Sequence, residues 1–162
     1  MTHDPAIKIY EAKPVVGENI APVVGLPANT EFHMALNNKT IKDNRIPPLG
    51  FANAAFAAVG AGPVGAIYAD GQNWDYTFYA IPRRAVRAEV RLLYQSIGSE
   101  FVEFLRDNGL PGGAGQQLYD LWMNNGKCPP EEMVAVSVEL LPVGSIGNPV
   151  PQTPTGMWLI VP

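Results

Sequence analysis

In three segments of the chain the side chains fall into two alternating sets with a period of two, and this pattern constrains the fold more than any other feature. The segments are residues 76–81, 86–92 and 134–140, and the second of them has one face of Val, Ala and Leu and one of Arg and Glu. Such alternation is typical of strands in antiparallel sheets with one buried face. Pro82 and Pro142 follow the first and third segments. We also expect strands at residues 7–12 and 32–36 and a terminal strand at residues 156–161.

Helical patterns occupy the stretch from about residue 96 to residue 126. Phe101, Phe104 and Leu105 recur at the spacing of one helix face, and a second helix is expected over residues 115–124. The order of strand, strand, helix, helix and strand favours an antiparallel sheet with a helical insertion over a doubly wound sheet. The sequence therefore predicts a mainly β protein, an antiparallel β-sandwich with a short two-helix insertion.

The length of 162 residues is that of one ordinary domain. We expect residues 1–143 to form the sandwich, with the helical insertion at about 96–126. Residues 144–162 are expected to form a Pro/Gly-rich tail that carries the terminal strand.

Composition excludes several classes of protein. The formal net charge of −4 argues against a nucleic-acid binder, which needs basic residues to neutralise phosphates. A single cysteine excludes an internal disulfide and cysteine-ligated metal centres. The first residues lack the basic and apolar regions of a signal peptide, and the longest apolar stretch, residues 51–69, is interrupted and too short for a membrane span.

Asp70, Asn73 and Asp75 form the most notable polar cluster, on a turn that contains glycine. Their oxygens could hold calcium, although the spacing differs from that of an EF-hand. The alternative is a turn in which Asp and Asn side chains bind nearby backbone amides. We expect Trp74 to pin this turn to the core, with Tyr94 and Trp122 as further core residues.

Asp43, Asn44 and Arg45 precede Pro47 and Pro48 in a segment rich in turn residues. These three side chains either structure the loop by hydrogen bonds or recognise a partner. Cys128 follows a lysine, which can activate a thiol, and we expect a further helical turn at residues 129–132. No second residue at a useful spacing makes a thiol or histidine site with Cys128 or His33.

Several segments occur in a fixed order along the chain, namely residues 9–12, 32–38, 42–51, 68–75, 92–96 and 101–105, followed by Trp122. Together they resemble the C-terminal β-sandwich region of secreted multihaem c-type cytochrome family proteins. The resemblance covers roughly residues 7–138, and its most specific parts are the Asp-Asn-Arg-Ile-Pro-Pro and Tyr-Gln sequences. The haem-attachment motif and the Thr-Gly-His-Lys type of strand that precede this region in the family are absent here.

The resemblance implies an accessory domain without its own haem, in a periplasmic or extracellular setting, although the chain carries no export signal. We therefore expect a non-catalytic structural or interaction module associated with a multihaem cytochrome or electron-transfer assembly. Its partner would be a cytochrome subunit or a second copy of the chain, and haem would be present only through a partner. The alternative is a β-sandwich that binds a small ligand or carbohydrate, with calcium at Asp70, Asn73 and Asp75. A hydrolase that uses His33 is the third hypothesis.

Overall fold

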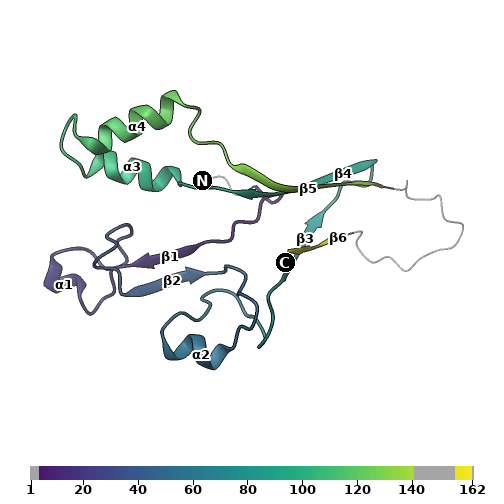
Figure 1. Cartoon of the computed structure of the whole chain (residues 1–162), viewed down its shortest axis with the longest axis horizontal. Coiled ribbons are helices and arrows are strands. Elements are labelled where there is room, and N and C mark those ends of the chain that lie inside the picture. The colour runs from purple at the N-terminus through teal and green to yellow at the C-terminus, as the bar shows by residue number, and fades with distance from the viewer. Residues whose placement is uncertain (1–3, 141–155, 162) are drawn as a thin grey trace, which may run out of the picture. The chain divides into compact units, whose positions relative to one another are not determined.

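The computed structural model describes residues 4–140 and 156–161, and these fall into two compact units. The first contains the residues up to Ala80 together with the terminal strand, and the second contains residues 81–140. In the described part of the chain, six strands form three two-stranded antiparallel sheets, and four segments are helical (Figure 1). The prediction of antiparallel strands with a two-helix insertion is confirmed, as a small mixed fold of strands and helices. Residues 144–155 of the expected tail lie outside the described residues.

In the first unit, β1 (Ala12–Val15) pairs with β2 (Lys39–Asp43), and the short helix α1 (Ala21–Val24) lies between them in sequence. The strand that we expected over residues 7–12 therefore begins only at its last residue. The expected strand at residues 32–36 is wrong. Phe32 has a φ of 67°, in the left-handed region, and a turn follows it, so extended pairing stops at the single bridge of Glu31 with Val15.

The same unit contains α2 (Asn53–Ala58) and the pair formed by β3 (Asp75–Ala80) and β6 (Gly156–Val161), so the alternating segment and the terminal strand are both found. The rings of Phe51 and Phe56 meet edge to face with centroids 4.8 Å apart. Apolar burial in the described residues of this unit is limited to a few side chains, namely Val15, Val16, Ala21, Phe51 and Tyr68.

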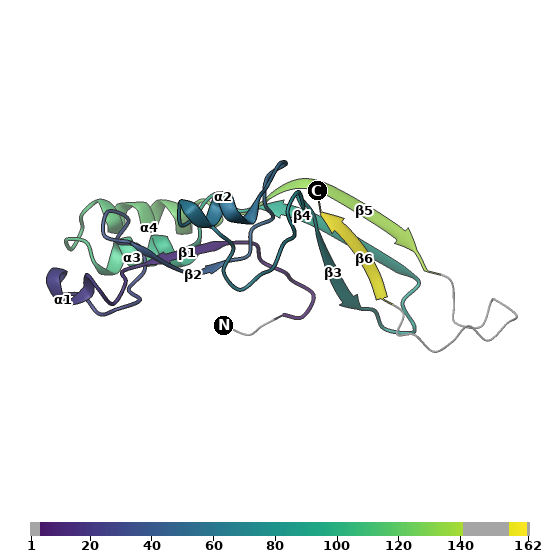
Figure 2. The ribbon, with the colours of Figure 1, turned by 90° about the horizontal axis from the view of Figure 1, so that it is seen from below.

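The second unit consists of a helical pair and a ribbon. The ribbon is formed by β4 (Arg87–Tyr94) and β5 (Glu131–Glu139), and the pair by α3 (Ser99–Asp107) and α4 (Ala114–Asn124). Figures 1 and 2 show the two helices side by side beyond one end of the ribbon, so they do not cover either of its faces. The helical turn expected at residues 129–132 is wrong, because β5 already begins at Glu131, after two prolines that favour extended backbone.

Close backbone contact holds the helical pair together. A Cβ atom placed on Gly115 would lie 1.9 Å from the carbonyl oxygen of Leu105, so only glycine fits where α4 passes the end of α3. Val102 and Trp122 are the buried side chains of the two helices. The guanidinium of Arg106 lies 4.3 Å above the ring of Tyr119 and adds a cation–π contact between the helices.

We predict that Gly115→Ala separates the helices. The added methyl group cannot be accommodated without moving backbone, which costs about 1–3 kcal/mol of unfolding free energy. Urea unfolding followed by circular dichroism measures the loss. Gly62→Ala is the matched control, since a Cβ there meets nothing within 4 Å. Equal stabilities of the two variants would contradict the close contact between Gly115 and the Leu105 carbonyl oxygen.

Candidate functional site

Asp43, Asn44 and Arg45 make an extensive set of local bonds. Arg45 donates from Nε and Nη2 to the two carboxylate oxygens of Asp43, at 2.8 and 2.6 Å. This ion pair lowers the pKa of Asp43, although partial burial acts in the opposite direction. The Asn44 side chain accepts from the backbone nitrogen of Glu11 and donates to the carbonyl of Ile9, so it fastens the N-terminal segment to the end of β2.

Asp70, Asn73 and Asp75 take part in different local structures. Asp70 accepts from the backbone nitrogen of Asn53 at 2.7 Å and from its side-chain amide at 2.9 Å. It therefore caps the first turn of α2, and the bonds from Asn53 lower the pKa of Asp70. Asn73 lies in the turn that Gln72 closes by bonds to Ala69 and Trp74.

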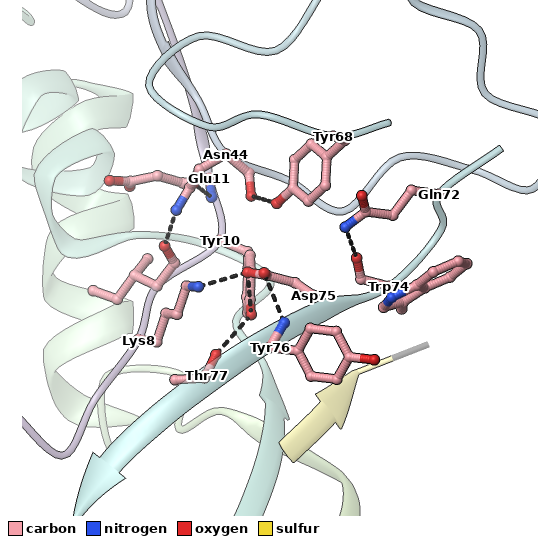
Figure 3. Close-up of polar contacts among 11 residues, drawn as sticks. Lys8, Tyr10, Glu11, Asn44, Tyr68, Gln72, Trp74, Asp75, Tyr76 and Thr77 are labelled. Carbon is pink, nitrogen blue, oxygen red and sulfur yellow. Dashed lines mark hydrogen bonds and ion pairs between the residues drawn. The ribbon is translucent and has the colours of Figure 1, made fainter. Parts of the chain in front are cut away.

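Asp75 is the centre of a second network, at the start of β3 (Figure 3). Its Oδ2 accepts from Nζ of Lys8 and from the hydroxyl of Tyr10, the latter at 3.0 Å. The Tyr10 hydroxyl is also 3.1 Å from Oγ1 of Thr77, which is buried. These bonds attach a segment near the N-terminus to a strand more than sixty residues later.

Burial and charge shift the pKa values in this network. Burial alone would raise the pKa of Asp75, but the bonds from Lys8 and Tyr10 lower it below the usual value. Burial likewise works against the Lys8 ammonium, but the bond to Asp75 raises the pKa of Lys8. Burial raises the pKa of Tyr10. The network thus holds one ion pair and a neutral phenol at neutral pH, an arrangement suited to holding chain segments together.

Among the described residues, no group of three or more His, Cys, Asp and Glu side chains is placed to hold a metal ion. His33 lies in the turn after Glu31, and Cys128 is partly buried just before β5. The carbonyl of Cys128 accepts from the side chain of Gln95 at 2.8 Å. Within the described residues, no helix is long and apolar enough to cross a membrane.

The β4–β5 ribbon has one polar and one apolar face. On the polar face, Arg87 donates to Oγ of Ser137 at 2.7 Å, and Arg91 donates to Glu89 at 2.7 Å. The apolar face consists of the cross-strand pairs Ala88 with Val138, Val90 with Val136, and Leu92 with Val134.

The apolar face of the ribbon is open to solvent. Val134, Val136 and Val138 are 51%, 49% and 41% exposed, and every residue of β5 is exposed. Water-exposed valine ladders of this length are unusual in a sheet, because one face normally packs on a core. The alternation in the sequence predicted this apolar face. The same alternation does not reveal that no other element of the second unit packs on the face.

Comparisons with known proteins add no assignment. No protein-family model, no curated protein and no solved structure matches this chain significantly.

We predict that Asp75→Asn removes a pH-dependent part of the stability. Because the folded-state pKa is lowered, this part is present above the unfolded pKa of about 4 and is lost as the pH falls through the folded value. At pH 7 the variant should lose about 1–2 kcal/mol of unfolding free energy, since Lys8 and Tyr10 lose a charged acceptor. Below pH ~3 the difference from the wild type should shrink. Glu103→Gln, at an exposed position of α3, is the control, and parallel pH profiles for Asp75→Asn and wild type would contradict the network.

A second prediction separates the helix cap at Asp70 from a calcium site. Asp70→Ala should lower the melting temperature in buffer with a calcium chelator, because the cap of α2 needs no ion. Thermal melts with and without calcium measure this loss. A loss that appears only when calcium is present would contradict the cap and favour an ion at Asp70, Asn73 and Asp75.

Proposed function

We propose that this chain is a non-catalytic interaction module that binds a partner protein through the apolar face of the β4–β5 ribbon. The observation that carries this proposal is the ladder of half-exposed valines at 134, 136 and 138, opposite Ala88, Val90 and Leu92.

The energetics of the ribbon support a partner. A two-stranded ribbon is marginally stable by itself, and a third strand or a packed face is needed for independent stability. Fully burying a valine contributes roughly 1.5–3 kcal/mol, so covering the remaining half of each of three side chains would contribute about 1 kcal/mol per residue. The polar face needs no such cover, because its charged side chains already bind one another.

The resemblance to the C-terminal region of multihaem cytochrome family proteins supports the class of partner. The chain lacks a haem-attachment motif, so any haem would belong to the partner. In this proposal the β-sandwich is completed between chains, with the partner packing on the valine ladder. The same resemblance supports a periplasmic or extracellular assembly for electron transfer.

We predict that Val136→Glu abolishes this association. A carboxylate at the centre of the apolar face would have to be buried without a partner, which costs several kcal/mol and should weaken binding at least a hundredfold. Native mass spectrometry of the protein isolated from its source, followed by a denatured run and haem absorbance, identifies the bound chain. The matched control is Ser137→Glu, one residue along the same strand on the polar face.

The expected result is a haem-bearing partner with the wild type and Ser137→Glu and none with Val136→Glu. A partner that remains bound to Val136→Glu would contradict the proposed face. A wild-type monomer whose β5 amides exchange slowly with solvent would also contradict it, because such a ribbon is already covered without a partner.

A further inference from the structure

We propose that the free edge of β4 pairs with β4 of a second copy of this chain, in antiparallel register about a two-fold axis at Val90. This inference rests on the proposed function, since it takes the ribbon to be the binding element. It concerns the edge of the ribbon, whereas the partner proposed above binds its face.

The backbone of β4 provides an edge for such pairing. The nitrogen of Leu140 donates to the carbonyl of Val86 at 2.8 Å, so Val86, and by alternation Ala88 and Val90, direct their backbone groups toward β5. The backbone N–H and C=O groups of Arg87, Glu89 and Arg91 therefore point away from β5. No described strand pairs with that side of β4. Antiparallel pairing of two copies would use these outward groups.

Glu89 and Arg91 are self-complementary in one central register, which leaves Arg87 opposite Leu93. With Val90 opposite Val90 of the second copy, Glu89 lies opposite Arg91 and Arg91 lies opposite Glu89. The same register places Ala88 opposite Leu92, and Val86 opposite Tyr94, two side chains that are 65% and 59% exposed in the single chain. Opposite charges and apolar pairs in directly facing positions both stabilise antiparallel strands.

Neighbouring registers are less favourable. A shift by one residue places the charged face of one copy beside the apolar face of the other. A pairing centred on Glu89 or on Arg91 brings like charges face to face, because that residue then meets its own copy. A pairing centred on Ala88 again matches Arg87 with Glu89, but it pairs only the first three residues of β4 with residues of β4 in the second copy.

The edge of β5 is a poorer candidate for self-pairing. This strand carries Glu131, Glu132 and Glu139 and no basic residue, so two copies of it would bring only negative charges together. Charged residues commonly protect an edge strand from unwanted pairing, and β5 fits that description. On β4, in contrast, the order of Arg and Glu residues matches an identical strand that runs in the opposite direction.

Pairing through β4 would give a four-stranded antiparallel sheet with strand order β5, β4, β4 and β5. Even-numbered residues of β4 meet even-numbered residues of the second copy, so the two valine ladders lie on the same side of the joined sheet. Four strands exceed the number needed for independent stability of a sheet with one apolar face.

The test uses charge reversal in the full chain, with mass measured by light scattering across the micromolar range. The wild type should be a dimer of the 17.5 kDa chain. Glu89→Arg alone and Arg91→Glu alone should each raise the dimer dissociation constant about tenfold or more, because both facing pairs become like-charged. The double variant E89R/R91E should regain most of the affinity. Glu103→Lys, at an exposed position of α3, is the control for a change in net charge.

Mixing the two single variants gives the sharpest result. A heterodimer of Glu89→Arg with Arg91→Glu has opposite charges at both facing positions, so it should form where neither variant dimerises alone. A dimer that is insensitive to all these changes would overturn the β4 register. A wild-type monomer at all concentrations would overturn self-pairing, while the separate comparison of Val136→Glu with Ser137→Glu would still test binding through the face.

Discussion

The pairing of Val134, Val136 and Val138 with Leu92, Val90 and Ala88 places three adjacent apolar pairs on one face of the ribbon. The helices of the same unit lie beyond the end of the ribbon and leave this face open (Figure 2). A ribbon of this kind gains little from its hydrogen bonds alone, since each strand can exchange them for bonds to water. The exposed apolar face is the basis of the proposed partner binding, whereas the proposed self-pairing rests on the backbone groups and charges at the edge of β4.

The first unit is held in a different way. Its described core is small, and polar side chains connect segments that are distant in sequence: Asn44 binds residues 9 and 11, and Asp75 binds Lys8 and Tyr10. The bonds of Asp75 involve a charged group and are therefore the stronger of the two sets. Asn44 directly follows β2 and Asp75 begins β3, so these strands hold in place the side chains that make the bonds. Short strands and many turns are thereby fixed without a large apolar interior.

The periodicity of side chains along the sequence predicted those helices and strands that have a clear apolar face of their own. The alternation at β3, β4 and β5 and the helix-face spacing at α3 and α4 are such cases. The prediction of a strand over residues 7–12 was wrong for most of its length, because residues 8–11 bind the side chains of Asn44 and Asp75 and do not pair with a neighbouring strand. Trp122 is buried as expected, whereas Trp74 and Tyr94 are exposed, because aromatic character does not show which side of an element is covered. The contacts of Asp75 join residues 65 and 67 positions apart, and no local pattern reveals them.

The edge and the face that we propose as binding surfaces belong to the same ribbon, and their combination has a consequence for affinity. A two-fold axis perpendicular to the joined sheet places both valine ladders on one side, so a dimer would present its partner with two equivalent apolar surfaces. Two linked sites bind a two-fold partner, or two partner chains held together, more tightly than either site alone, because the second contact is intramolecular. Disrupting the charge pairing at the edge would then weaken binding at the face without changing any residue of that face.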